Sequence, residues 1–357
     1  MALSEVVNVE QTIIVEVARK ETIDLIRADK SRNGQVIPII ARELMGYLIA
    51  QTILIPKINE VYGELFSFEG AEFYEIPHVD ELKALETFSH IIPIEEGERT
   101  FALSEGIRDL RRTRNNPLSE PIKMKLKEPL NGEKRTVIVF GRSTKRPYIE
   151  DSIRRFSLDS GQKTDIRFIE ETSPQTILAT IEKNLEIDTI VILSDDTLPE
   201  DHLDSNVLFT LLLIKDITKK RNITVIVEIL NQLHQEISKR YNVDNVIVST
   251  TYVSHIITQI SENRNLFTLF EDLLTYDDGK DASYEIYTYD AEKLFGDPLP
   301  LSFESKSLFI YSLYQASKRR MIPIGIIHEG RSLLFKGNLD KENLRIEKGD
   351  RIVVVDR

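Results

Sequence analysis

Cysteine is absent from the 357 residues, which excludes disulfide bonds, thiolate zinc sites and cysteine nucleophiles. Long apolar runs are lacking as well. Proline and charged residues interrupt the most membrane-like stretch, 36–58, and its uninterrupted part, 44–55, is about half of the roughly 20 residues that span a bilayer. We therefore expect a chain that does not cross a membrane by itself, in keeping with a reducing compartment such as the cytoplasm.

A signal peptide and a basic surface are lacking too. The first residues, MALSEVVNVEQ, contain neither the basic region nor the apolar core of a secretory signal. The formal net charge is −12, and the basic runs are short and scattered, as solvated helix ends are. Because a phosphate backbone would be repelled on average, we expect no nucleic-acid partner.

What the sequence does contain is an internal repeat. Residues 12–16 read TIIVE and residues 224–228 read TVIVE, a separation of 212 residues (228 minus 16). A polar, helix-like segment follows each copy and leads to a second apolar strand, at 35–37 and at 245–247. Duplicated α/β units in one chain usually form two packed domains that work together.

The second copy predicts an open parallel sheet of Rossmann type. Short runs rich in β-branched residues alternate with helix-like segments, as in parallel sheets covered on both faces. The predicted strands are 136–140, 165–170, 189–193, 224–230 and 246–249. One helix is expected to open at Ser173-Pro174, because proline suits the first helical position, and another to cover 206–217. The first copy lacks the opening strands, so the predicted fold class is α/β with a duplicated Rossmann-like sheet.

Each copy also carries an apolar helix face of the same spacing. The positions follow the i, i+3, i+4, i+7, i+8 pattern of a single face. They are Ile58, Val61, Tyr62, Leu65 and Phe66 in the first copy and Leu266, Leu269, Phe270, Leu273 and Leu274 in the second. Two interpretations stay open. The faces form the core of their own domain, or the helices cross over and bury them on a partner lobe or subunit.

The remaining segments predict two smaller α+β lobes. One follows the first pair of helices and is reduced, with a charged, turn-rich linker, and the other, with short strands and tight turns, closes the chain. The predicted domains are 1–70 and 134–283 for the Rossmann-like lobes with their helices, 71–133 for the reduced lobe and linker, and 284–357 for the last lobe.

The turn after the first strand of the complete sheet is a candidate cofactor site. Dinucleotide-binding sheets carry G-x-G-x-x-G there, but this turn has a single glycine, Gly141. Arg142, Ser143 and Lys145 could still help the start of the next helix to hold an anion such as a nucleotide phosphate. Glu170, at the end of the second strand, stands where a ribose-binding acid is expected. The alternative is a plain structural turn.

Asp195 and Asp196 are a candidate metal site. They follow a predicted strand at the carboxyl edge of the sheet, where open α/β sheets place their ligands. Two adjacent carboxylates could contribute to a Ca²⁺ site, and the alternative is a helix cap. The six histidines show no ligand-like spacing, and no residue stands out as catalytic.

Three segments resemble the CASTOR/POLLUX ion channel family. Residues 68–74, FEGAEFY, are similar to that family's FENAEFY, with Gly70 in place of the asparagine. Residues 40–45, IARELM, are similar to its IGRLM, where Arg42 matches the arginine, although the glycine is replaced and one residue is extra. Residues 204–217, DSNVLFTLLLIKDI, are similar to its DSRSLATLLLIRDI.

The resemblance implies a pair of RCK (regulator of K⁺ conductance) domains, which form a gating ring on the cytosolic side of a pore. On this interpretation the chain begins inside the first Rossmann sheet. It would be a regulatory, non-enzymatic homo-oligomer at the inner face of the membrane, and its pore domain would lie on a preceding segment or a separate chain. The rival hypothesis is a soluble NAD-dependent enzyme, which would need a glycine-rich turn and an acid or base that the sequence does not show.

Overall fold

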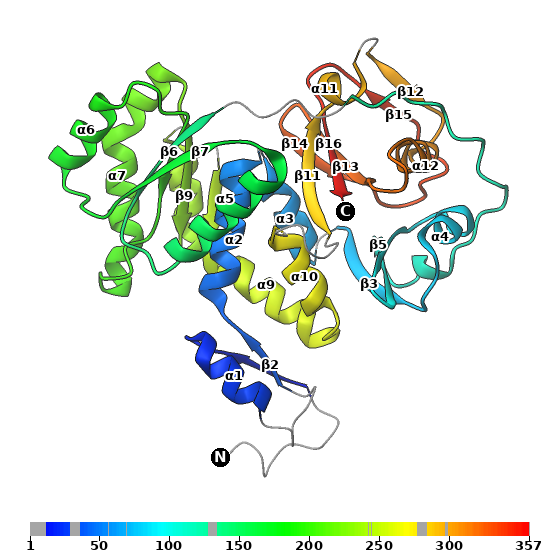
Figure 1. Cartoon of the computed structure of the whole chain (residues 1–357), viewed down its shortest axis with the longest axis horizontal. Coiled ribbons are helices and arrows are strands. Elements are labelled where there is room, and N and C mark those ends of the chain that lie inside the picture. Colours follow the sequence, from blue (N-terminus) through cyan, green and yellow to red (C-terminus); the bar gives the residue numbers. More distant parts are fainter. Residues whose placement is uncertain are drawn as a thin grey trace.

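The computed structural model describes residues 12–28, 36–55, 57–68, 70–127, 134–241, 243, 245–276, 284–296 and 299–356. The expected domain boundaries at 133 and 283 lie outside these residues. Within them, no helix is both long enough and apolar enough to cross a membrane. The chain has a five-stranded Rossmann-like lobe, two smaller antiparallel lobes and, between them, two pairs of helices (Figure 1).

The central sheet confirms the predicted fold class. Its five parallel strands are β6 (Arg135–Phe140), β7 (Thr164–Ile169), β8 (Thr189–Ile192), β9 (Thr224–Ile229) and β10 (Asn245–Val248). The helices between them are α5 (Arg146–Ser160), α6 (Pro174–Lys183), α7 (Glu200–Arg221) and α8 (Gln235–Lys239). Helix α6 begins with Pro174 after Ser173, whose side chain caps it, as expected. Helix α7 is longer than the predicted 206–217 at both ends.

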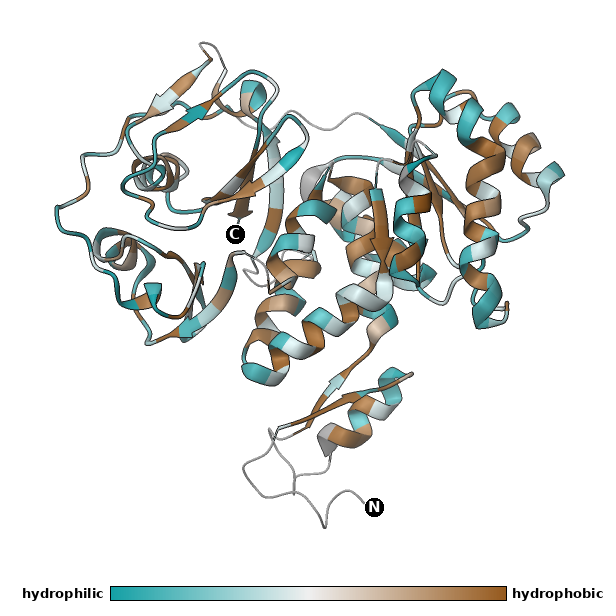
Figure 2. Cartoon of the chain, turned by 180° about the vertical axis from the view of Figure 1, so that it is seen from behind, coloured by the Kyte–Doolittle hydropathy of each residue, from teal (hydrophilic) through white to brown (hydrophobic). Residues whose placement is uncertain are grey.

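Apolar side chains project from both faces of the sheet into a core, which is why its strands are almost uniformly apolar. One face packs on α6 and α7 through a core that includes Ile138, Ile192 and Leu211. The other face, with Val139 and Val191, belongs to a larger core that continues into α5 and the central helices. Figure 2 shows this concentration of apolar residues on the strands and on the helices between the lobes.

The strand order determines where a ligand site can form. The strands lie in the order β10-β9-β8-β6-β7, so that β7 lies on one side of β6 and β8, β9 and β10 follow in turn on the other side. In such sheets the crevice at the carboxyl ends of the two strands where the order reverses is the usual binding position. Here those strands are β6 and β8, and the two candidate segments of the sequence follow them.

The first copy reproduces only the last part of this sheet. Its strands β1 (Ile13–Glu16) and β2 (Val36–Ile39) are parallel and joined by α1 (Lys20–Ala28), as β9 and β10 are joined by α8. This unit projects from the rest of the molecule (Figure 1). Strand β9 pairs with β8 as well as β10, whereas β1 pairs with β2 alone among the described residues.

The helices that follow repeat without any shift between the copies. They are α2 (Ala41–Leu54) and α3 (Ile58–Phe66) in the first copy and α9 (Ser249–Glu262) and α10 (Leu266–Leu274) in the second. Both pairs are 208 residues apart (249 minus 41 and 266 minus 58). The four helices pack together in one core, so each copy buries its predicted apolar face on the other copy within the same chain.

The two small lobes also correspond to each other as copies of one unit. The first contains β3 (Glu72–Ile76), α4 (Glu81–Thr87), β4 (Ile92–Glu96) and β5 (Arg99–Ser104). The second contains β11 (Glu285–Asp290), α11 (Ala291–Phe295), β12 (Leu301–Phe303), α12 (Lys306–Ala316), β13 (Ile322–His328), β14 (Arg331–Leu334), β15 (Leu344–Ile346) and β16 (Arg351–Asp356). The order β3-β5-β4 matches β11-β16-β13, so the first lobe is a reduced version of the second.

A buried carboxylate joins the two small lobes. Glu81 of α4, only 1% exposed, accepts hydrogen bonds from the hydroxyls of Tyr284 and Tyr314 in the last lobe. The Leu339 amide also donates to the Ser89 carbonyl at 2.9 Å. The copies are therefore in contact at their small lobes as well as at the four helices.

The contact between α2 and α5 requires glycine at position 46. A Cβ atom there would lie 2.6 Å from Cβ of Tyr148 and 3.2 Å from the Lys145 carbonyl oxygen. We expect Gly46→Ala to destabilise the chain by about 1–3 kcal/mol, as overpacked substitutions do. Urea unfolding of Gly63→Ala is the matched control, since a Cβ there meets nothing closer than 3.4 Å. Equal stability of the two variants would contradict the close packing of α2 on α5.

A histidine–aspartate pair joins β13 to the turn before β16. Nδ1 of His328 lies 2.7 Å from Oδ1 of the buried Asp350, and this hydrogen bond raises the His328 pKa above its ordinary 6.5. Because the folded-state pKa is raised, the stabilisation is complete below pH 6.5 and is lost as the pH rises through the raised pKa. NMR titration should show His328 ionising above 6.5 in the native chain and at lower pH in Asp350→Asn. A native pKa at or below the ordinary value would contradict the pairing.

Candidate functional site

The structure brings the turn after β6 and the segment after β8 together at the switch point of the sheet. Gly141 has a φ of +109°, and a Cβ atom at this position would lie 2.5 Å from the Leu193 carbonyl oxygen. The single glycine of the turn is therefore required by the close approach of the β6 and β8 ends.

The side chain of Asp196 accepts the hydrogen bonds that the residues of this turn donate. Oδ2 of Asp196 accepts from the backbone N–H and the hydroxyl of Thr144, both at 2.7 Å, and from the Ser143 hydroxyl at 3.3 Å. The Asp196 amide donates in return to the Arg142 carbonyl at 2.8 Å. Since α5 begins two residues after Thr144, the carboxylate lies where an α/β sheet usually places a ligand anion.

Lys145 extends a charged network beneath this contact. Its Nζ lies 3.1 Å from Oε1 of Glu228, which is fully buried on β9, and 3.7 Å from Oδ1 of Asp196. Burial disfavours the charged ammonium, but the two carboxylates outweigh this effect, so the pKa of Lys145 is raised. Glu228 also accepts from the hydroxyl of Ser249, the first residue of α9. The network thus connects the switch point to a central helix.

The predicted ribose-binding acid, Glu170, is held at the rim by two arginines. Its carboxylate lies 3.1 Å from Nε of Arg142 and 3.4 Å from Nη1 of Arg146. The Arg146 guanidinium also stacks over the Phe168 ring, 4.6 Å from its centroid. All five residues of the predicted cofactor site, namely Gly141, Arg142, Ser143, Lys145 and Glu170, are therefore near the switch point, where the charged ones are already paired.

The two residues of the predicted metal site have different roles. Oδ1 of Asp195 accepts from the amide and hydroxyl of Thr197, at 3.0 and 2.6 Å, while Asp196 binds the opposite turn. Neither caps a helix, because the residue that precedes α7 is Pro199, and the helix-cap alternative is wrong. In the described part of the chain no group of three or more His, Asp or Glu residues could hold a metal ion. The calcium site stays a prediction.

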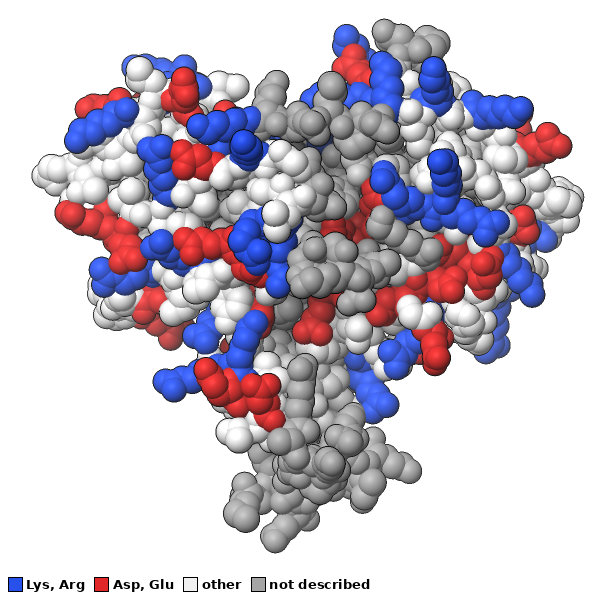
Figure 3. Space-filling model, in the orientation of Figure 1, with Lys and Arg blue, Asp and Glu red and all other residues white. Residues whose placement is uncertain are grey.

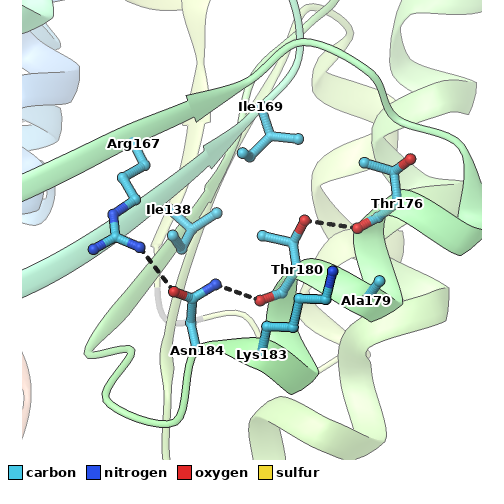
Figure 4. A pocket seen from close by; sticks show the side chains of 8 residues that line it. All are labelled: Ile138, Arg167, Ile169, Thr176, Ala179, Thr180, Lys183 and Asn184. Carbon is cyan, nitrogen blue, oxygen red and sulfur yellow. Dashed lines mark hydrogen bonds between the residues drawn. The ribbon is translucent and has the colours of Figure 1, made fainter.

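A cavity of about 370 Å³ lies between β6, β7 and α6 (Figure 4). Three of its polar side chains form a chain of hydrogen bonds along its wall. Arg167 donates to the Asn184 side chain at 2.8 Å, Asn184 donates to the Thr180 carbonyl at 2.6 Å, and Thr180 donates to the Thr176 carbonyl at 2.7 Å. These bonds are drawn in Figure 4, where Lys183 also lines the cavity and takes part in none of them.

A larger cavity, of about 640 Å³, lies between the two copies beside the β6–α5 turn. The first copy contributes Lys20, Arg42 and Tyr47, and the second contributes the turn and the start of α5. Reasoning from sequence missed this cavity, because its two walls are about a hundred residues apart and only the packing of α2 on α5 brings them together. The resemblance of residues 40–45 singled out Arg42, but it did not indicate which residues form the opposite wall of the cavity.

Comparison with known proteins adds similarities of structure. No family model and no curated protein match this chain. The crystal structure of the GsuK RCK domain is similar with a TM-score of 0.37 and 11% identity, over 96% of this chain and 72% of that one. The GsuK channel and the GsuK channel bound to NAD match with TM-scores of 0.37 and 0.35 and 10% identity, over 97% of this chain. The chain covers 60% of those two channel chains.

The Lys145–Glu228 pair offers a test of the network. Lys145→Met should destabilise the chain by about 3–5 kcal/mol, because it leaves the carboxylate of Glu228 buried without its cation. The double variant Lys145→Met/Glu228→Leu removes both charges and should recover most of the loss. Urea unfolding measures both variants. A single variant as stable as the native chain would show that the pair is not closed in solution.

Proposed function

We propose that the chain is a regulatory module of a cation channel or transporter, built from two RCK-type domains of the CASTOR/POLLUX kind. The module acts at the inner face of the membrane, assembles with further copies of itself, and couples ligand binding to ion conduction through a pore on another segment or chain. The motifs at 40–45, 68–74 and 204–217 support the family, and the paired architecture supports the role.

The observation that carries the proposal is a reciprocal exchange of hydrogen bonds between the copies. The Gln51 side chain of α2 donates to the Leu273 carbonyl of α10 at 3.1 Å. The Gln259 side chain of α9 donates to the Leu65 carbonyl of α3 at 3.1 Å. The two glutamines are 208 residues apart in the sequence (259 minus 51), and so are the two leucines (273 minus 65). A domain pair joined in this symmetric way would pass a movement of one copy to the other.

Exposed apolar side chains support assembly into a larger complex. Phe209 and Leu212 are one turn apart on α7, and Leu233 and Ile237 lie on the neighbouring segment that includes α8. The two elements are adjacent, since Asp204 of α7 binds Nδ1 of His234 at 2.7 Å. We take these exposed apolar side chains on two adjacent elements as candidates for an interaction surface. Acidic and basic side chains are interspersed on the face that Figure 3 shows.

The proposal includes no catalytic step. An NAD-dependent enzyme on this sheet would need the turn after β6 to receive the pyrophosphate, and there Asp196 takes up the donors of Thr144. Turnover of a substrate with a nicotinamide cofactor would contradict the regulatory proposal.

Assembly can be tested by size-exclusion chromatography with light scattering. We expect the native chain to form oligomers at micromolar concentration, and Phe209→Asp to weaken them, because it places a charge in the apolar surface. Leu185→Asp is the matched control, since Leu185 is also exposed but lies after α6, and should leave assembly unchanged. A native chain that is strictly monomeric would count against the module.

A further inference from the structure

The cavity between β6, β7 and α6 lies on a face of the central sheet, apart from the switch point. None of its lining residues belongs to the turn after β6 or to the segment after β8. It lies beside β7, the last strand of the sheet on this side. Its floor is apolar and consists of the fully buried Ile138 and the partly buried Ile169, which belong to one core.

One face of α6 forms the wall of this cavity. The lining positions follow the i, i+3, i+4, i+7 spacing of a single helix face, and they are Thr176, Ala179, Thr180 and Lys183. The Thr180 hydroxyl donates to the Thr176 carbonyl at 2.7 Å, and the Thr176 hydroxyl accepts from the capping Ser173 at 2.9 Å. Because both hydroxyls are bonded within the helix and its cap, this part of the wall offers a ligand chiefly apolar contact.

Lys183 is the one basic residue of the lining whose charge has no counterpart. Among the described residues, no carboxylate lies within ion-pair distance of its ammonium group and no hydrogen bond is made to it. A lysine in the last turn of a helix often serves the terminal carbonyls. Here Arg221 of α7 already does so. Its guanidinium donates to the carbonyls of Ile181, Asn184 and Leu185, at 2.8, 2.6 and 2.7 Å.

The other basic residue of the lining, Arg167 on the β7 side, is already neutralised. Its Nη2 lies 2.7 Å from Oδ2 of Asp165, and its Nη1 donates to the Asn184 side chain. The lining contains no acidic side chain, so one uncompensated positive charge remains, at Lys183 (Figure 4). An apolar cavity with one free cation at its edge suits a molecule that combines an apolar body with a single negative charge.

We propose that this cavity binds an amphiphilic carboxylate of the medium-chain fatty acid type, with its hydrocarbon chain on the isoleucine floor and its carboxylate at Lys183. The volume of about 370 Å³ lies within the range of small-molecule sites. A ligand in this position would tie α6 to the edge strand β7. The inference rests on the proposed function only in treating the ligand as a regulator, and the binding itself is independent of assembly.

Calorimetric titration of the full chain with octanoate, below its micelle-forming concentration and at constant ionic strength, tests the site. We expect saturable binding that Lys183→Gln weakens about fivefold or more, through loss of a charge-assisted contact, and that Lys183→Arg largely restores. Ala179→Leu should weaken binding about tenfold or more, because the larger side chain fills the cavity. Lys219→Gln is the matched control, since Lys219 of α7 is exposed but does not line the cavity, and should bind as the native chain does.

Titrations with 1-octanol and acetate separate the contributions of chain and carboxylate. Each lacks one half of the recognised group, so we expect both to bind about tenfold or more weakly than octanoate. The inference is overturned if octanoate shows no saturable binding, if Lys183→Gln and Lys219→Gln weaken it equally, if Ala179→Leu binds as the native chain does, or if 1-octanol or acetate binds as well as octanoate. A monomer that binds octanoate with the expected pattern would contradict the oligomeric module and support this site. An oligomer that does not bind octanoate would do the reverse.

Discussion

The two buried glutamines of the central helices join the copies in a way that apolar packing alone does not. Each reaches across to a carbonyl near the end of the other copy's second helix, where the last carbonyls of a helix have no partner of their own. An unpaired buried carbonyl costs about 1–3 kcal/mol, so the two exchanges favour one relative placement of the helices. The edge-to-face contact of Phe66 with Phe270, at 5.1 Å, lies in the same core. The placement of the first copy against the second depends on this junction.

The same junction places the first copy against the switch point of the second. Gly46 lets α2 approach α5 closely, and this approach creates the cavity between Arg42 and the β6–α5 turn. The network of Lys145, Glu228 and Ser249 then leads from that turn back to α9. A ligand that changed the Asp196 contact would therefore act on elements at both ends of the helix pair.

The fold could be predicted from the sequence to the extent that its signals are local. The buried strands of the central sheet are apolar on both faces, and the start of α6 is marked by Ser173-Pro174. The prediction missed the start of helix α7 because its first turns are mostly polar and show no apolar face. There Asp204 accepts hydrogen bonds from the Leu230 and Asn231 amides. The candidate segments of the site were recognised, but their pairing depends on β6 lying next to β8, which no local pattern reveals.

Native-state hydrogen exchange of Gln51→Leu tests most directly whether the two copies form one unit. The substitution removes one of the two first-copy donors to the Leu273 carbonyl, the other being the Tyr62 hydroxyl at 2.7 Å. The account predicts that amide protection falls by a similar free energy in α9 and α10 as in α2 and α3. A loss of protection confined to α2 and α3, with α9 and α10 unchanged, would contradict the account, because the copies would then be independently stable domains.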